Sequence, residues 1–381
     1  MNLLFVTEIA PFPINGGEKL RSYGLLKMMS DLNLNVQAII GKSSSKELLN
    51  KHLKGIAFHE YDFQKRLHCG RLQKYYRLFS MDKELLACID KILENNTIDI
   101  VYIDYHLYGQ YIGYFKKKKF PVIYGTHNAQ AKLIYQRPAV SLTHRVRLFI
   151  DYLAHRIHEW YFFRKADALI VVSEEDKKYH QAFIPKDKIF VIPNFLIDSE
   201  YQVLSPEKEN YVLMTANFEA FQNRFGLEWF IREVWDQEIQ KITRLKLAGF
   251  YSDKVFASLK EKYDMTHIEA MGEAEDLKPY IVRAKASIVP LLHGSGSRLK
   301  CIESMAMKTQ LISTSRGAEG IDHDQSILIA DEPSDFRNKL LAVLRGEINL
   351  TEKAHNAYLR KYSLEPNKTI FRTIIHNISG S

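Results

Sequence analysis

Residues 290–314, PLLHGSGSRLKCIESMAMKTQLIST, connect two apolar runs through a turn of small residues and a short amphipathic segment. The flanking runs ASIVPLL (286–292) and QLISTS (310–315) are typical of buried strands. Between them, apolar residues recur at helical spacing, which predicts a helix over 298–308. A strand followed by a helix and a further strand is the repeating unit of a parallel α/β sheet.

The turn at 294–297, GSGS, leads into this predicted helix, so its backbone N–H groups should point away from the chain. Arg298 and Lys300 add full positive charges to the end of the helix where the dipole is already positive. Because the dipole does not favour cations there, their presence indicates a bound anion. The alternative is a glycine turn with solvated basic residues. The spacing differs from the GxxxxGK[ST] loop of ATP-binding proteins.

Short apolar runs alternate with helical patterns along the whole chain. A polar connection at 194–210 interrupts this alternation, which then starts again. Strand–helix alternation predicts parallel sheets, and the restart predicts two of them. The runs expected to form strands are 2–7, 36–41, 98–104, 121–126, 168–173, 189–193, 211–217, 245–249, 267–272, 286–292, 310–315 and 326–330.

The predicted fold class is therefore α/β, with two doubly wound, Rossmann-like parallel-sheet domains facing a cleft. We expect the first domain at 1–195, a linker at 196–210 and the second domain at 211–381, with its final helix packed back on the first domain. Ligands of such sheets bind at the carboxyl ends of strands. Glycines gather at one such end in each domain: at Gly16-Gly17 and in the 294–297 turn.

The composition is that of an ordinary globular protein, with 46% hydrophobic and 26% charged residues among 381. Cys69, Cys88 and Cys301 lack the spacing of a metal site and cannot all form disulfides, which indicates a reducing compartment. The first residues lack a basic leader, and no run of about 18 apolar residues could span a bilayer. We therefore expect a cytoplasmic protein.

The net charge of +8 lies entirely in residues 1–200, because residues 201–381 hold 24 basic and 24 acidic residues. The excess is greatest around FKKKKF (115–120), and aromatic clusters lie nearby at 75–79, 105–115 and 159–165. Basic residues beside aromatic ones suit an anionic membrane surface or a phosphorylated lipid. Nucleic acid would also be attracted, although no recognised binding motif is present. A solvated basic face is the remaining alternative.

Four stretches together resemble the retaining glycosyltransferases of the two-domain GT-B fold, family 4. They are PFPINGGEKLRSYGLLKMMSDLNLNV (11–36), VIPN (191–194), GSGSRLKCIESMAM (294–307) and TSRGAEGI (314–321). The resemblance covers nearly the whole chain, and the third stretch is its most specific part. In that family this segment binds the diphosphate and ribose of a nucleotide-sugar donor.

The resemblance implies roles for single residues. The turn would cradle the diphosphate, the two cations would neutralise it, and the acid one helical turn further on would accept hydrogen bonds from the ribose hydroxyls. The alternative for this acid is an exposed residue paired with Lys300 or Lys308. The implied donor-binding residues of the segment are Ser295, Gly296, Ser297, Arg298, Lys300 and Glu303.

Two positions depart from the family pattern. Ser295 stands where many members carry a second glutamate near the donor sugar, so the sugar hydroxyls must be bound differently. Many members also carry an arginine and a lysine after the first strand of the donor domain, and here Arg224 is the counterpart. The identity of the donor is therefore left open.

In the first domain, the resemblance implies that Gly16 and Gly17 approach donor phosphate and acceptor, because no side chain blocks their backbone. Arg21, one turn along the next helix, would touch a substrate or lie on the surface. His127, at a strand end in YGTHNAQ (124–130), would contact the transferred sugar, for example by donating to a hydroxyl. The implied catalytic residues are His127 and Glu303.

The function so implied is transfer of a sugar from a UDP- or GDP-sugar to a hydroxyl of a polysaccharide or lipid-linked glycan precursor, with retention. We expect no cofactor and no metal, although Asp322-His323-Asp324 imitates a metal signature of another glycosyltransferase fold. The expected location is cytoplasmic, at the inner face of an anionic membrane, without nucleic acid as a partner. The rivals are a nucleotide-sugar epimerase of the same architecture and a non-catalytic nucleotide- or carbohydrate-binding protein.

Overall fold

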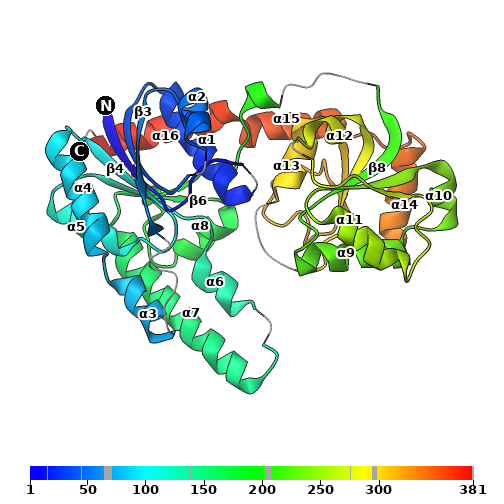
Figure 1. Ribbon diagram of the computed structural model, residues 1–381, viewed down its shortest axis with the longest axis horizontal. Helices are drawn as coiled ribbons and strands as arrows, with labels where there is room; N and C mark the ends of the chain where they lie inside the picture. The colour runs from blue at the N-terminus through cyan, green and yellow to red at the C-terminus, as the bar shows by residue number, and fades with distance from the viewer. Residues whose placement is uncertain are drawn as a thin grey trace. The chain divides into compact units, whose positions relative to one another are not determined.

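In this computed structural model the chain divides into two compact units (Figure 1). The first comprises Met1–Asn194 with Asn367–Ser381, and the second comprises Phe195–Pro366. The ring of Phe371 lies 6.0 Å from that of Tyr102, a core residue of the first unit, so the end of the chain packs with that unit. The structure describes all residues except 15, 44, 64–70, 138, 202–206, 275, 294–297 and 380–381, and the side chains of 71 and 72.

The first unit is built on a seven-stranded sheet in the order β3-β2-β1-β4-β5-β6-β7. All its neighbouring strands are parallel. Its strands and helices are β1 (Asn2–Val6), α1 (Gly17–Asp31), β2 (Asn35–Gly41), α2 (Lys46–His52), β3 (Ile56–Tyr61), α3 (Arg71–Phe79), α4 (Lys83–Asn95), β4 (Ile100–Asp104), α5 (Gln110–Lys117), β5 (Val122–Gly125), α6 (Gln130–Tyr135), α7 (Leu142–Phe162), β6 (Ala168–Val171), α8 (Glu174–His180), β7 (Ile189–Val191) and most of α16 (Leu364–Ser379).

The second unit contains a six-stranded parallel sheet in the order β10-β9-β8-β11-β12-β13. Within the stretch expected to be a linker, Leu196 and Ile197 are buried, and β8 begins at Glu209. The unit's strands and helices are β8 (Glu209–Thr215), α9 (Phe221–Glu233), α10 (Gln237–Ile242), β9 (Arg244–Ala248), α11 (Ser252–Lys260), β10 (Ile268–Ala270), α12 (Lys278–Arg283), β11 (Ala284–Val289), α13 (Leu299–Ala306), β12 (Gln310–Ser313), β13 (Leu328–Ile329), α14 (Pro333–Leu344) and α15 (Thr351–Lys361).

The predicted α/β class with two Rossmann-like parallel sheets is confirmed, and each of the twelve expected runs overlaps an observed strand. The edge strand β3, IAFHEY, was missed. Its residues are exposed or half-buried, because only one neighbour covers it, and it includes His59 and Glu60. An edge strand carries a weaker apolar signal than the fully buried strands of a parallel sheet.

Both faces of the second sheet are covered, as the alternation of side chains along β8 shows. Val212 and Met214 belong to one apolar core, whereas Tyr211 and Leu213 belong to another. Successive side chains of a strand point to opposite faces, so one strand supplies both cores. Because helices cover both faces of this sheet, a ligand can reach it only at the loops that follow the strand ends.

The strand order places a topological switch point in each unit. In the first sheet it lies between β1 and β4, and in the second between β8 and β11. At a switch point the connections from neighbouring strands run to opposite faces, which opens a crevice at the carboxyl ends. The candidate site residues of each unit are therefore sought at these ends.

The longest helix of the first unit, α7, is held to its neighbours by the buried Glu159. Its carboxylate accepts from the backbone N–H of Ala131 at 3.0 Å and from the hydroxyl of Tyr179 at 2.9 Å. These bonds join α7 to α6 and α8. Among the described residues, no helix is both long enough and apolar enough to cross a membrane.

Burial raises the pKa of Glu159 from 4.5 to about 7, which makes the stability of the first unit pH-dependent. Between these two values the folded chain binds the proton more tightly than the unfolded chain, so stability falls as pH rises. Relative to Glu159→Gln, the wild-type free energy of unfolding should decrease by roughly 3 kcal/mol between pH 4.5 and 8. Urea unfolding of both proteins across this range measures the difference. Parallel pH profiles would contradict the assignment.

Candidate functional site

The site expected in the second unit lies where β11 leads into α13. Helix α13 begins at Leu299, with Arg298 as its N-cap, and ends at Ala306. The predicted helix over 298–308 thus exists, slightly shortened. Gly294, Ser295, Gly296 and Ser297 lie outside the described residues, so their expected role at the diphosphate stays a prediction.

Arg298 and Lys300 bring two positive charges to the start of α13. Arg298 is buried, and its Nη2 lies 3.5 Å from Glu319 Oε2. Lys300 is half-buried, and its Nζ donates at 3.2 Å to Asn223 Oδ1, a neutral acceptor. Burial lowers the pKa of Arg298 and lowers that of Lys300 to about 8. Two adjacent cations whose charged forms are both disfavoured by burial make a strong site for an anion.

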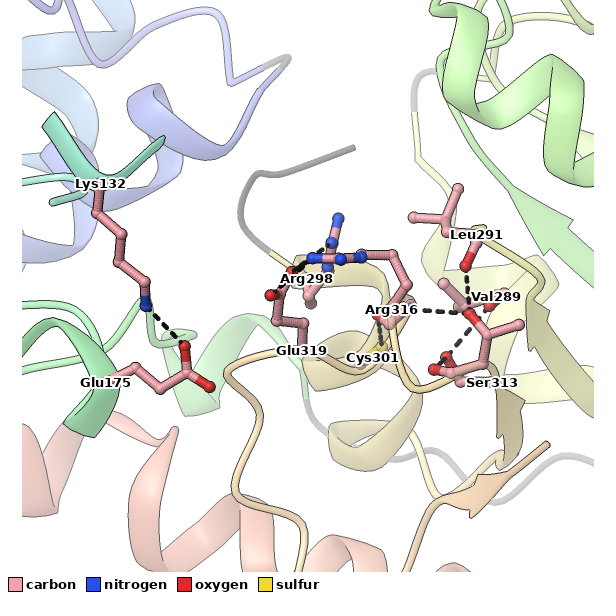
Figure 2. A network of polar contacts seen from close by, with 11 residues as sticks. Lys132, Glu175, Val289, Leu291, Arg298, Cys301, Ser313, Arg316 and Glu319 are labelled. Carbon is pink, nitrogen blue, oxygen red and sulfur yellow. Dashed lines mark hydrogen bonds and ion pairs between the residues drawn. The ribbon is translucent and has the colours of Figure 1, made fainter. Parts of the chain in front are cut away.

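The loop after β12 holds Glu319 beside Arg298 (Figure 2). Arg316 donates to both oxygens of the same carboxylate, at 2.8 and 2.9 Å. Gly317 anchors the loop on the end of β11, because an added Cβ would lie 2.3 Å from Ser313 Oγ and 2.4 Å from Val289 O. Cys301 Sγ donates to the Gly317 carbonyl at 3.5 Å. The TSRGAEGI segment is therefore packed against α13, and its carboxylate is shared between two arginines.

Glu303 lies one turn beyond Lys300 and is half-buried. Its Oε1 accepts from the hydroxyl of Tyr201 at 3.2 Å, and burial raises the pKa of its carboxyl. Lys308, one of the expected partners, instead forms an ion pair with Glu352 at 2.8 Å. The alternative of an exposed, lysine-paired Glu303 is therefore not what the structure shows. No local pattern pointed to Tyr201, which is 102 residues away in the sequence.

Arg224 lies exposed on the first turn of α9, and the contact with Lys300 comes from its neighbour Asn223. Gly226 brings this helix close to the carboxyl end of β11, since an added Cβ would lie 2.3 Å from the Pro290 carbonyl oxygen. A side chain at this position would push α9, and Asn223 with it, away from the strand end. Asn223 is therefore a candidate site residue that sequence reasoning missed.

In the first unit, His127 lies buried at the end of β5 beside Asp104, the last residue of β4. Its Nε2 lies 2.7 Å from Asp104 Oδ2, and within the described part of the chain Nδ1 has no hydrogen-bond partner. A carboxylate only accepts, so Nε2 carries the hydrogen, and Nδ1 of the neutral ring is an acceptor. A neutral His127 would therefore accept from a sugar hydroxyl rather than donate to it.

Tyr105, the residue after Asp104, has a strained backbone with φ of 110°. The Tyr105 backbone is fixed by two bonds: its N–H donates to the Gly125 carbonyl at 3.0 Å, and its carbonyl accepts from the Tyr124 hydroxyl at 2.8 Å. Its ring meets that of His127 edge-on at 5.2 Å. Positive φ in a bulky residue is uncommon and concentrates at functional sites.

Glu8, just after β1, completes this group of side chains at the switch point of the first unit. It accepts from the hydroxyl of Tyr108 at 2.7 Å, and burial raises the pKa of its carboxyl. Glu8 and Asp104 were both missed, although each directly follows or ends an apolar strand run. That position, a polar residue at a strand's carboxyl end, is the signal that could have found them.

The glycine turn of the first unit precedes α1. Gly16 caps this helix in an extended conformation, an added Cβ there would meet nothing within 4 Å, and Gly17 is the first helical residue. Arg21 is neither a surface residue nor exposed to a substrate, since it is buried with Nη1 donating to the Ile192 carbonyl at 3.0 Å. This hydrogen bond connects α1 to the residue that follows β7.

The Asp322-His323-Asp324 motif is occupied by ion pairs in this structure. Lys361 contacts both carboxylates, and Arg360 contacts Asp324. Over the described ranges, no group of three or more His, Cys, Asp or Glu side chains could hold a metal ion.

Two family models match the chain, one over β3 to β7 of the first sheet and one over the second sheet. Residues 55–199 match the family described as Glycosyltransferase Family 4, and residues 209–346 match the family described as Glycosyl transferases group 1. The second match includes β8, β11 and α13, and therefore Arg298, Lys300 and Glu303.

Two curated relatives and one solved structure are similar to the chain. An uncharacterized 44.6 kDa protein in the cps region of Klebsiella pneumoniae is 23% identical over 98% of both chains. A Campylobacter jejuni protein named GalNAc-alpha-(1->4)-GalNAc-alpha-(1->3)-diNAcBac-PP-undecaprenol alpha-1,4-N-acetyl-D-galactosaminyltransferase is 27% identical over 53% of this chain and 58% of its own. The structure of HepE from Anabaena in complex with UDP and glucose aligns over 100% of both chains, with a TM-score of 0.68 and 13% identity.

The structural likeness establishes the architecture, and the family matches establish the class of enzyme. The alignment with HepE extends over the full length of both chains, so the likeness includes both sheets. Residues 55–199 of the first unit and residues 209–346 of the second match glycosyltransferase families independently of each other. The chain therefore carries a Glycosyltransferase Family 4 domain and a Glycosyl transferases group 1 domain on the GT-B fold.

Proposed function

We propose that this glycosyltransferase moves a sugar from a UDP- or GDP-sugar to a hydroxyl of a polysaccharide or lipid-linked glycan precursor, with retention at the anomeric carbon. The observation that carries the proposal is the pair of cations at the start of α13, the buried Arg298 and the half-buried Lys300. Burial removes both positive charges from water, and the negative charges of a diphosphate would compensate for that lost hydration.

The chemistry requires stabilisation of the departing nucleotide diphosphate. Arg298 contacts Glu319 and Lys300 contacts Asn223, so both cations are positioned by the protein and little reorganisation accompanies the developing charge. The two cations supply the charge that a divalent metal ion supplies elsewhere. We therefore expect transfer to proceed without an added metal ion and to be unaffected by EDTA.

Features of the relatives support the donor and acceptor classes in this proposal. The HepE structure contains UDP and glucose, and the name of the Campylobacter relative includes an undecaprenol-linked diphosphate. The Klebsiella relative is described by its place in a cps region. A nucleotide-sugar donor and a lipid-linked or polysaccharide acceptor agree with all three.

Glu303 is the proposed acceptor for the ribose hydroxyls, and Glu303→Gln tests this role. The substitution keeps the size of the side chain but removes the charge, so UDP and GDP should lose about tenfold in affinity. Their 2′-deoxy analogues should lose less than about twofold, because they make fewer ribose hydrogen bonds. Glu352→Gln, on the exposed partner of Lys308, is the control. Equal losses for ribose and deoxyribose nucleotides would place the carboxylate elsewhere.

A thermal-shift screen with UDP, GDP, ADP and their sugars tests the proposal as a whole. A bound donor stabilises the folded chain by mass action, so the matching nucleotide should raise Tm and the others should not. Product assays follow with donor alone and with donor plus an acceptor extract. Epimerised donor in the absence of acceptor would indicate an epimerase, and nucleotide binding without turnover would indicate a non-catalytic binding protein.

A further inference from the structure

Eight large apolar side chains of α7 are exposed. Leu142, at the start of the helix, is 78% exposed, and Phe149, near its middle, is 53% exposed. A monomeric soluble protein rarely exposes so many apolar groups together unless they bind something. We name this set the α7 stripe; it consists of Leu142, Val146, Phe149, Ile150, Leu153, Ile157, Trp160 and Tyr161.

The α7 stripe follows the helical period. At 3.6 residues per turn its members fall within roughly a third of the helix circumference. The opposite face carries the buried residues His155, His158, Glu159 and Phe162. Because α7 has 21 residues, the stripe runs along about 30 Å of helix. The inward face therefore packs into the core of the first unit. Packing within the chain does not account for the outward apolar face.

The charged residues of α7 are also divided between its two faces. Its two acids lie off the stripe: Glu159 is buried, and Asp151 accepts from Lys74 at 2.9 Å and from Tyr75 at 2.6 Å. Arg145 and Arg147 are exposed beside the stripe. All residues of α7 are described, so the exposed surface of this helix carries cations and no carboxylate.

The ends of the stripe also suit an interface between water and an apolar phase. At its C-terminal end the guanidinium of Arg164 lies over the ring of Trp160, 4.2 Å from the centroid. Tryptophan and tyrosine with adjacent cations are enriched where a bilayer meets water. Figure 1 shows α6 and α7 as a hairpin that projects from the sheet of the first unit. Each side chain of the stripe is at least 41% exposed.

We propose that the α7 stripe docks in the headgroup region of an anionic bilayer, with its apolar side chains inserted and Arg145 and Arg147 on the lipid phosphates. A basic amphipathic helix of this kind lies in the plane of the interface. A second copy of the chain is a poorer partner, because a two-fold contact would bring identical arginine-flanked surfaces together without a carboxylate to pair them.

This surface differs from the basic run at 116–119 that the sequence pointed to. Lys116 forms an ion pair with Asp167 at 2.8 Å, and Lys118 forms one with Asp90 at 3.1 Å. Part of that charge is therefore already neutralised within the chain. The α7 stripe does not depend on glycosyl transfer, so it can be tested apart from the proposed function.

Binding to vesicles gives the direct test. The full chain should float with vesicles of phosphatidylglycerol and phosphatidylcholine, bind pure phosphatidylcholine less, and dissociate as salt is raised. Trp229 and Trp235 are buried, so Trp160 is the tryptophan that should shift its fluorescence to the blue on insertion. Trp160→Phe should abolish that shift while binding persists.

Matched variants locate the surface. Phe149→Ser with Leu153→Ser should reduce vesicle binding at least about tenfold, because two large apolar side chains no longer leave water. Phe250→Ser with Leu359→Ser, equally exposed in the second unit, should leave it unchanged. Arg145→Gln and Arg147→Gln should each lower binding to anionic vesicles about fivefold. Lys117→Gln with Lys119→Gln should lower it less than about twofold.

Three outcomes would overturn this proposal. The first is no flotation at low salt by a chain that still shows its Tm rise with nucleotide. The second is an equal loss from the Lys117 and Lys119 pair, which would place the surface on the basic run. The third is a dimer in sedimentation that the Phe149 and Leu153 variant dissociates, which would assign the stripe to a second copy. Nucleotide binding should be retained in every variant. Its retention would show that these results concern the membrane surface and not the proposed glycosyl transfer.

Discussion

Replacing His127 with alanine is expected to lower kcat by about 100-fold or more while leaving the affinity for free nucleotide within about twofold. The ring is buried and held through Nε2 by Asp104, so Nδ1 has a fixed direction. A group that touches only the reacting sugar stabilises the transition state and leaves the contacts of the nucleotide unchanged. Steady-state kinetics with the donor, together with nucleotide titration, measures both quantities.

Asp104→Asn tests the same arrangement by changing the hydrogen-bond partner of His127. An amide can donate to Nε2, which would favour the tautomer with its hydrogen on Nδ1 and exchange an acceptor for a donor. We expect kcat to fall again with the nucleotide affinity preserved. Normal turnover in a well-folded His127→Ala would remove this residue from the site.

His180→Ala is the control for damage to the fold. His180 is buried in the same unit and packs against Phe163 and Phe183 at 5.8 and 5.5 Å between ring centroids. Its loss should lower Tm without a comparable change in kcat. If His127→Ala lowers Tm and activity in the same proportion as His180→Ala, then His127 is structural.

Lys300→Ala and Arg298→Ala are each expected to weaken nucleotide diphosphate binding by about 1.5–3 kcal/mol, the range for hydrogen bonds to charged groups. Because burial lowers the pKa of Lys300 to about 8, the affinity of the wild type should also fall as pH rises through 8. This fall should be absent from Lys300→Ala. Isothermal titration from pH 7 to 9 measures both effects.

Lys308→Ala is the matched control, since Lys308 follows the same helix and is already paired with Glu352. It should bind nucleotide as the wild type does. Wild-type affinity in both the Lys300 and Arg298 variants would mean that the start of α13 does not hold the diphosphate. Loss of affinity together with a lower Tm in the absence of ligand would mean that the cations support the fold instead.

Much of the fold was predictable because the signals are local. The runs at 2–7 and 286–292 are continuous apolar segments, and such segments are recognisable without knowledge of their neighbours. Strand β3 was missed because one side of it is open and its residues are mixed. The signal that placed Arg298 and Lys300 at a helix start was also local, since both follow a run of small residues in the sequence.

The partners of these residues were not predictable, because each comes from a distant part of the chain. Asn223 lies 77 residues from Lys300, and Tyr201 lies 102 from Glu303. Asp104 and His127 meet because β4 and β5 are adjacent parallel strands whose carboxyl ends coincide. No local pattern specifies which strand ends become neighbours or which side chains lose water.

By itself the sequence determined the α/β class, the two sheets, most of their strands and the charged start of α13, since these depend on periodicity and on neighbours along the chain. Only the tertiary structure decided that Arg21 is internal, that Tyr105 is strained beside His127, and that burial shifts the pKa of Lys300. It also decided that one face of α7 stays uncovered. Burial and hydrogen bonding depend on which elements pack together, and strand order and register fix that packing.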